Sequence, residues 1–179
     1  MKNLKKTFFI YFVMISFTVI MYSCCDENYR IVGNGSIAIY DLTTSGYFDN
    51  DSVGIVTGRF TIEMNPELEM AAVHMKSGLI SSAFATSCDE TIENEVVAST
   101  LKITCDKAII YEGDSVAPGT NLTSLEELGF SASVAYVMID FPDALMEKLE
   151  FADKVYQFTV SINTTDDMVL QNSISTRFE

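Results

Sequence analysis

The chain has 179 residues, with 11 basic and 25 acidic side chains and a formal net charge of −14. That length suits one domain. So acidic a chain lacks the basic stripe that neutralises nucleic-acid phosphates, and we therefore expect no nucleic-acid partner.

The first 23 residues have the parts of a secretory signal. Lys2, Lys5 and Lys6 precede a predominantly apolar run over 8–21 that contains no charged residue, which gives the basic start and apolar centre of such a signal. A membrane-spanning helix needs roughly 20 apolar residues, more than this run supplies. The sequence therefore predicts a cleaved leader over 1–23 and not an anchor helix.

The end of the leader resembles a bacterial lipobox, in which a cysteine is lipidated and becomes the new N-terminus. Ser23 and Cys24 match that motif, whereas Met21 and Tyr22 depart from its usual residues. The stretch 25–27 is similar to the acidic signal of Bacteroidota-type surface lipoproteins. The alternative is a soluble secreted protein with two accidental cysteines. We expect lipid attachment at Cys24 and a lipid-anchored location in the outer membrane or at the cell surface.

Cleavage before Cys24 removes three lysines and no acid, so the remaining 156 residues carry 8 basic and 25 acidic side chains. An anionic membrane repels a body of this charge, which favours a solvated domain on a tether. We assign the polar stretch 24–29 to the lipidated tether and 30–179 to a single β-sandwich domain.

Strand patterns recur along that domain. Apolar and polar residues alternate over 36–42 and 54–64, which is typical of half-buried strands; Pro66 should end the second. Further strands are predicted at 69–75, 79–86, 99–105 and 133–140. The clearest hairpin joins 155–161 to 168–175 across 163–167, which places Asp166 and Asp167 at its tip.

Helix signals are confined to connections between strands. Thr123 to Glu126 has the spacing of a capping box, with Gly129 as a left-handed stop. A second short helix is predicted over 142–150, with Pro142 at its first position. Short strands with helical turns only between them indicate an all-β fold, and we expect an antiparallel immunoglobulin-like β-sandwich with one or two short helices in its connections.

Several fragments of this domain resemble a known family. They are 82–89 (SAFATSCD), 101–104 (LKIT), 117–122 (APGTNL) and 156–160 (YQFTV). They are similar to an uncharacterised family of small Bacteroides-type lipoproteins, whose domain has no known function. The resemblance covers most of the chain after the leader, and it implies no activity and no catalytic residue.

The cysteines and the single histidine limit the chemistry. With Cys24 lipidated, Cys88 and Cys105 each close a predicted strand, and an oxidising compartment favours a disulfide between them over two buried free thiols. No CxxC spacing occurs, which argues against redox chemistry and structural zinc. His74 lies in an alternating strand, so we expect a structural or exposed imidazole and no zinc centre.

Other candidate sites are weaker. Oxygen-rich 49–52 (DNDS) has ligands that Ca²⁺ accepts but no EF-hand order, and such residues also dominate ordinary turns. Pairs of carboxylates occur by chance among so many acids. Ring stacking on sugars is open to Tyr40, Tyr47, Phe48, Tyr111 and Tyr136, although core packing is the commoner use of such residues. We expect no metal and no cofactor.

These observations favour a non-enzymatic binding or assembly module on the surface of a lipid-anchored protein. Its partners would be the membrane, through the N-terminal lipid, and a protein or a glycan. The alternatives are an accessory glycan-binding or adhesion component and, less favoured, a small carboxylate-dependent hydrolase. Connecting loops carry most contact surfaces in β-proteins, so we expect contacts at 43–52 and 106–121.

Overall fold

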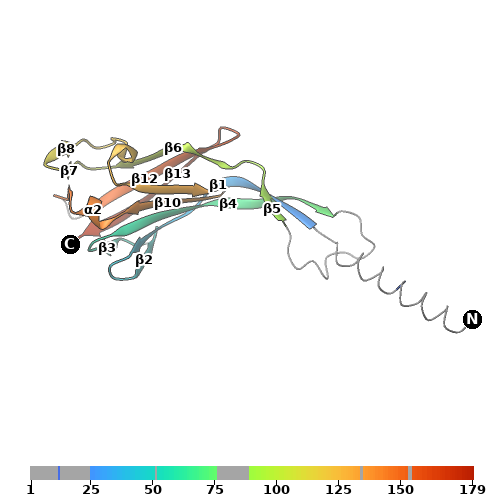
Figure 1. Ribbon diagram of the computed structural model, residues 1–179, viewed down its shortest axis with the longest axis horizontal. Coiled ribbons are helices and arrows are strands. Elements are labelled where there is room, and N and C mark those ends of the chain that lie inside the picture. Colours follow the sequence, from blue (N-terminus) through green and yellow to red (C-terminus); the bar gives the residue numbers. More distant parts are fainter. Residues whose placement is uncertain (1–11, 13–24, 51, 76–88, 134, 153–154) are drawn as a thin grey trace, which may run out of the picture. The chain divides into compact units, whose positions relative to one another are not determined.

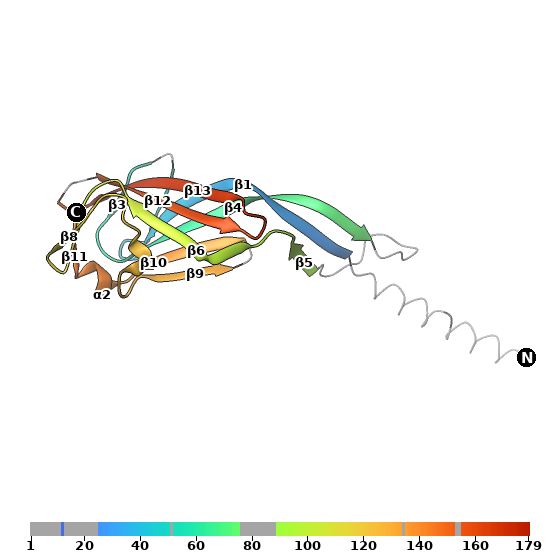
Figure 2. The same cartoon turned by 90° about the horizontal axis from the view of Figure 1, so that it is seen from above.

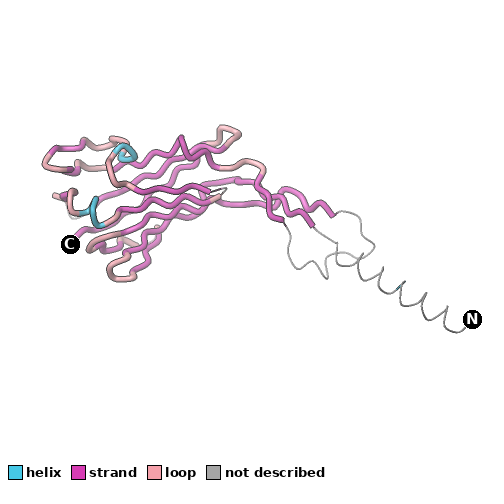
Figure 3. The backbone as a smooth tube through the Cα atoms, viewed as in Figure 1, coloured by secondary structure: helices cyan, strands magenta, loops and turns pink. Residues whose placement is uncertain are grey.

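The computed structural model describes residues 12, 25–50, 52–75, 89–133, 135–152 and 155–179. The predicted leader apart from residue 12, Cys24, the predicted strand 79–86 and Cys88 lie outside these residues. Strands dominate the described chain and most of them pair antiparallel, with helical turns only in two connections (Figure 3). The prediction of an all-β chain is thus confirmed.

The largest sheet, which we call sheet A, has six strands. Across it the order is β2 (Gly46–Asp49), β1 (Cys25–Asp41), β4 (Phe60–Met75), β10 (Tyr136–Phe141) and β9 (Gly129–Ser133), and β5 (Asp89–Ile92) pairs with the start of β1. The β1–β5 pair is parallel, whereas β2, β9 and β10 pair with their neighbours in antiparallel register. Figure 2 shows β10 and β9 side by side.

The second sheet, sheet B, contains the predicted C-terminal hairpin. Its order is β3 (Gly54–Val56), β13 (Val169–Phe178), β12 (Val155–Thr164) and β6 (Val96–Cys105). The hairpin pairs Val155 with Arg177 and Asn163 with Val169, and β6 lies along its other side (Figure 1). Both the hairpin and the predicted strand at 99–105 are confirmed.

A small third sheet, sheet C, has the order β11 (Leu149–Glu150), β7 (Ile109–Tyr111) and β8 (Asp114–Val116). Next to it, Lys148 Nζ lies 2.9 Å from a carboxylate oxygen of Glu112 and 2.9 Å from one of Glu127. Hydrogen bonds to these two carboxylates raise the pKa of Lys148. The same residues connect the loop after β7 to the turns before β9 and β11.

Two strand predictions need correction. The pattern over 54–64 is not one strand, because β3 belongs to sheet B and β4, from Phe60 on, to sheet A. Pro66 does not end β4, which continues to Met75. β10 pairs with β4 only as far as Met64, so Pro66 lies where that ladder no longer requires an N–H. The predicted strand 133–140 is likewise divided, between the end of β9 and most of β10.

β1 approaches β4 closely beside this proline. Gly35 has φ +61°, and a Cβ built on it would lie 1.9 Å from the Asn65 carbonyl oxygen and 2.6 Å from the Glu67 nitrogen. A side chain at position 35 would therefore collide with backbone, and glycine is also the residue that adopts this φ without strain.

Both helix predictions were too long. The first is a 3₁₀ turn, η1 (Leu122–Ser124), capped by the Asn121 side chain, which accepts from Thr123 N. Its left-handed residue is Glu127, at φ 72°, and Gly129 instead begins β9. The second helix, α2 (Asp143–Met146), has Pro142 at its N-cap. Both segments are too short to gain much from helix propagation.

The core lies between sheets A and B, where aromatic rings from both sheets meet. The Phe60 and Phe141 rings of sheet A stack at 4.3 Å, and the Phe158 ring of sheet B lies 6.0 Å from the first and 5.7 Å from the second. All three side chains are fully buried. Burial of such large rings removes apolar surface from water and so stabilises the fold.

The chain divides into two compact units, one formed by 1–30 and 69–93 and the other by 31–68 and 94–179. In the first, β1 pairs with β5 from Asp26 to Tyr29, and Glu93 N donates to the Tyr29 carbonyl at 2.9 Å. Residues 25–29, which the sequence assigns to a tether, thus lie in a strand. The candidate site belongs to the second unit.

Candidate functional site

The outward side of sheet A carries a connected group of polar aromatic residues. Along β4 the side chains of Phe60, Ile62 and Met64 are buried, so Glu63 lies on the opposite side of the sheet. The same alternation along β10 buries Val137 and Ile139 and leaves Tyr136 and Met138 half-buried. We call Tyr40, Tyr47, Glu63 and Tyr136 the tyrosine–glutamate face.

Two tyrosines of this face form a cross-strand pair. Tyr40 of β1 lies directly opposite Tyr47 of β2 in the antiparallel ladder. Their ring centroids are 4.9 Å apart with the planes inclined at 58°, and Tyr47 is 57% exposed. Such pairs stabilise a sheet, and this one also presents an aromatic surface to solvent.

Glu63 connects the pair to the third tyrosine. The Tyr136 hydroxyl donates to Glu63 Oε1 at 2.9 Å, and the same carboxylate is near enough to Tyr40 to raise the pKa of its phenol. Burial raises the pKa of Tyr136 to about 12, and the Glu63 carboxylate contributes to this shift because it disfavours a phenolate beside it. Burial and Glu63 also raise the pKa of Tyr40. Both phenols are therefore neutral donors at neutral pH.

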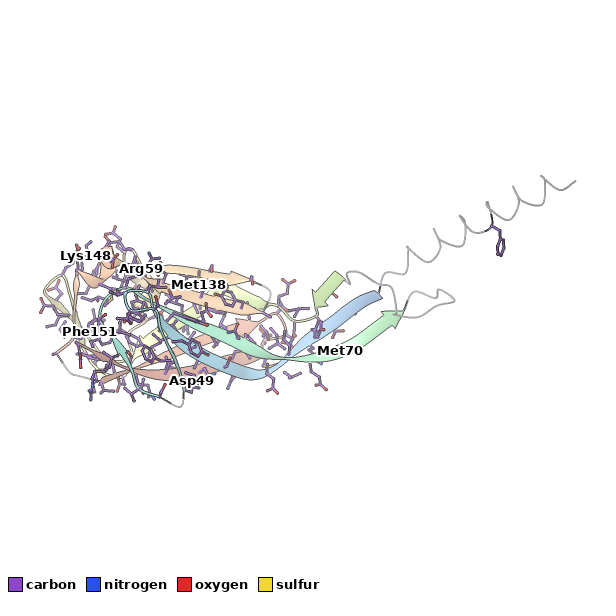
Figure 4. All side chains as sticks on the ribbon, turned by 90° about the horizontal axis from the view of Figure 1, so that it is seen from below. Asp49, Arg59, Met70, Met138, Lys148 and Phe151 are labelled. Carbon is purple, nitrogen blue, oxygen red and sulfur yellow. The ribbon has the colours of Figure 1, made fainter. Side chains whose placement is uncertain are left out.

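The rim of the face is polar. Arg59 Nη2 lies 3.3 Å from Asp140 Oδ2, and Thr61 Oγ1 donates to Asp140 Oδ1 at 3.3 Å. Met138 pairs in register with Glu63, and Figure 4 labels it together with Arg59. The one arginine on this rim is thus already paired with a carboxylate.

Asp41 positions Tyr47 by fixing the turn between β1 and β2. Its fully buried carboxylate accepts from Thr43 N at 2.8 Å, from Thr44 N at 3.2 Å and from Thr44 Oγ1 at 2.8 Å. It also accepts from the amide and the hydroxyl of Thr57, both at 3.3 Å. Burial opposes ionisation of Asp41, but the hydrogen bonds from Thr44, Thr43 and Thr57 outweigh it and lower its pKa.

The other two aromatic residues considered for ring stacking lie elsewhere. Phe48 pairs with Ile39 and so lies on the inward side of the sheet. A Cβ built on Gly54 would lie 2.1 Å from Phe48 Cγ, so the ring occupies the space that a side chain at position 54 would need. Tyr111 belongs to β7 in sheet C. The structure therefore brings together Tyr40, Tyr47 and Tyr136 only.

Glu63 was not singled out by the sequence. The alternation over 54–64 predicts that it faces outward, but its partner Tyr136 is 73 positions away along the chain. Only the register between β4 and β10 brings the two together.

Cys105 is a buried free cysteine whose Sγ lies 3.7 Å from Asp106 Oδ1. Burial raises its pKa to about 11, so the thiol is protonated and unreactive at neutral pH. Because Cys88 lies outside the described residues, the disulfide between the two stays a prediction.

The other candidates form no site in the described part of the chain. Ser52 closes a turn onto Asp49, with N–O and Oγ–Oδ1 distances of 3.2 and 3.5 Å, and Asp51 is outside the described residues. His74 lies in β4, as predicted. Among the described residues no group of three or more His, Cys, Asp or Glu side chains is placed to hold a metal ion.

Asp166 lies in the turn of the hairpin, as predicted, and there it has a structural partner. Its Oδ2 accepts from Asn94 Nδ2 at 3.2 Å, and buried Asn94 also binds the amide and the carbonyl of Ile31 at 2.7 and 3.0 Å. This network connects the hairpin tip to β1.

None of the helices that the structure describes is long and apolar enough to span a membrane.

Comparisons with known proteins add little to this geometry. No protein-family model and no curated protein matches the chain. One solved structure, described as BspA_C_mut, matches 84% of this chain at 8% identity with a TM-score of 0.26, and the chain spans 46% of its length. At that TM-score the match carries no argument about fold or function.

Proposed function

We propose that this chain is a lipid-anchored protein of the outer membrane or cell surface that acts as a non-enzymatic binding or assembly module through its tyrosine–glutamate face. One observation carries the proposal: Tyr47, 57% exposed, stands against Tyr40 on the outward side of sheet A. Exposed tyrosines lose little conformational entropy on binding and are enriched at interfaces.

The scaffold for this face is, in our proposal, an immunoglobulin-like sandwich. Its support is the contact of Phe60 and Phe141 in sheet A with Phe158 in sheet B. Two sheets that pack across buried rings form a rigid platform, and a rigid platform lowers the entropic cost of binding.

Cross-linking from the two outward faces tests the binding role. A photo-reactive amino acid replaces Tyr47 in one full-length chain and Ser173, on the outward side of sheet B, in another. We expect cross-linked products in the native cell from position 47 and not from position 173. Products from position 173 alone would contradict the proposal.

The anchor is proposed to be a lipid on Cys24, in keeping with the resemblance to small Bacteroides-type lipoproteins. Cys24→Ser should abolish acyl labelling, release the protein from membranes and leave unprocessed precursor. Acyl label that persists in this variant on Cys25 would overturn the assignment.

The proposal includes the absence of enzymatic turnover. We expect the soluble chain from Asp26 onward to leave glycosidase, esterase and peptidase substrates intact. Turnover that disappears when one acidic residue is changed to its amide, with the fold retained, would favour the carboxylate-dependent hydrolase.

A second candidate is an accessory glycan-binding or adhesion component, which the exposed Tyr40–Tyr47 ring pair favours because sugar rings stack on aromatic faces. Retardation of the protein in gels containing neutral polysaccharides, lost in Tyr47→Ala, would support this candidate. Unchanged mobility would remove it.

A further inference from the structure

The charges on and around the tyrosine–glutamate face indicate which kind of ligand it takes. Glu63 lies among three tyrosine rings on an outward sheet surface. The ion pairs recorded for the described residues involve Asp140, Glu112 and Glu127, and none of them involves Glu63. The face therefore combines aromatic surface with a carboxylate that has no basic partner among the described residues.

The ionisable groups around the phenols of Tyr136 and Tyr40 agree with this. The charged or ionisable groups that act on Tyr136 are Glu63 and Tyr40, and those that act on Tyr40 are Glu63 and Tyr47. No basic group is among them. Arg59, on the rim, is held by Asp140 at 3.3 Å.

Rings and carboxylate together are complementary to a cation. The face of a tyrosine ring attracts a guanidinium or ammonium group within about 6 Å of its centroid, and a carboxylate beside the rings adds a charge-assisted hydrogen bond. The Tyr136 hydroxyl donates to Glu63 Oε1 at 2.9 Å and so holds the carboxylate in place beside the rings. At long range, 25 acidic against 11 basic side chains attract a basic partner.

We infer that the tyrosine–glutamate face binds a basic polypeptide segment of a partner protein, with a Lys or Arg side chain over the Tyr40–Tyr47 pair and its charge at Glu63. This inference rests on the proposed binding role of the same face and names the chemistry of its partner. Acidic glycans are excluded by the same charge, because the face offers them no free cation.

Calorimetric titration of the soluble chain from Asp26 onward with a ten-residue peptide of alternating arginine and glycine tests the inference. An acidic protein attracts such a peptide nonspecifically, so the decisive comparison is between Glu63→Gln and Glu150→Gln. Each removes one negative charge, but Glu150 lies exposed in sheet C. We expect Glu63→Gln to weaken binding about three- to ten-fold, and Glu150→Gln to change it less than about two-fold.

An aromatic control isolates the rings. Phe130 of β9 is 47% exposed. It pairs with buried Ile139 of β10, so its side chain lies on the inward side of sheet A and not on the tyrosine–glutamate face. Tyr47→Ala should weaken peptide binding as much as Glu63→Gln does, and Phe130→Ala should not. Circular dichroism and the melting temperature of each variant show that the fold is retained.

The other outcomes separate the inference from the proposed function. Equal losses in Glu63→Gln and Glu150→Gln would overturn the inference, since binding would then follow net charge alone. Binding of a neutral polysaccharide that depends on Tyr47, without peptide binding, would overturn the partner class but keep the binding face. Cross-linking from Ser173 and not from Tyr47 would remove the binding face itself.

Discussion

Sheets A and B bury one side each against a common aromatic core, yet their outward sides differ in chemistry. The tyrosine–glutamate face of sheet A has three aromatic rings around a carboxylate. The outward side of sheet B is polar and mostly hydroxyl-bearing, and we call its residues the serine–threonine face: Lys102, Thr104, Gln157, Thr159, Ser161, Ser173 and Ser175.

Two hydroxyls of the serine–threonine face hydrogen-bond to each other. Thr104, Thr159 and Ser173 stand in one row across β6, β12 and β13, and the last two hydroxyls are 2.8 Å apart. Short hydroxyl side chains paired in this way leave little apolar surface for a partner. Strand alternation alone therefore does not decide function; the residue types placed on each outward side do.

The largest expected effect comes from removing the two strands that carry most of the serine–threonine face. A chain that ends after Glu150 loses β12 and β13, and with them Phe158, whose ring joins the core of both sheets. We expect an insoluble or unfolded product, because the lost burial exceeds a typical stability of about 5–15 kcal/mol. Phe158→Ala should cost about 3–5 kcal/mol in urea unfolding. A truncated chain that melts cooperatively would place the core elsewhere.

Substitution of Asp41 tests whether its buried carboxylate fixes the turn between β1 and β2 that positions Tyr47. Asp41→Ala removes all five hydrogen bonds that hold the turn to this buried carboxylate, so we expect a loss of about 2–4 kcal/mol in the free energy of unfolding. Asp114→Ala, at an exposed residue of β8, is the control and should cost less than about 0.5 kcal/mol.

The pH dependence of stability sharpens the Asp41 prediction. Because the pKa of Asp41 is lowered in the folded chain, its contribution is present above the ordinary Asp pKa of about 3.9 and is lost as pH falls through the folded value. Asp41→Asn should lose part of this acid dependence in urea titrations between about pH 5 and about pH 2, while Asp114→Asn should retain it. Identical acid profiles would contradict the hydrogen-bonded, ionised state of Asp41.

Glu63 tests whether the tyrosines form one connected group. Glu63→Gln removes the negative charge beside Tyr136, so the pKa of that phenol should fall from about 12 toward its ordinary value. The raised pKa means that stability is present below about pH 10 and is lost as pH rises toward the folded pKa. Ultraviolet titration of the phenols measures the change in pKa, and an unchanged Tyr136 titration would show that the two residues are not coupled.

The smallest changes in stability separate the two faces most cleanly. Tyr47→Ala and Thr159→Ala should each cost at most about 1 kcal/mol, because one ring is largely exposed and one hydroxyl pair is lost. Only Tyr47→Ala should weaken binding of the arginine–glycine peptide. Equal binding by both variants would leave the faces indistinguishable.

Local patterns predicted the strands better than the site. Alternation over 155–161 and 168–175 was enough for the hairpin, since its pairing is local and Asp167 adopts the left-handed φ of 63° that a tight turn uses. The prediction that Pro66 ends its strand was wrong, because a proline is tolerated there once β10 stops pairing with β4. Likewise the turn at 122–124 is capped by Asn121, whose Oδ1 also accepts from Ile103 N on β6, a contact that no local motif contains.

The site shows the same limit. Five aromatic residues were candidates for ring stacking, and only the registers of β2 with β1 and of β10 with β4 separate Tyr40, Tyr47 and Tyr136 from the inward Phe48. The role proposed for Glu63 depends on Tyr40 and Tyr136, which lie on two other strands. The register between strands that are far apart in the sequence depends on how the whole core packs, and it could not be predicted from this sequence alone.

The most direct test of the binding face is a chemical-shift map of the soluble chain titrated with the arginine–glycine peptide. We predict shifts that saturate at the amides of β1, β4 and β10 around Tyr40, Glu63 and Tyr136, together with the ring signals of Tyr47, while Thr159 and Ser173 stay unchanged. Shifts concentrated on β12 and β13 would contradict the account.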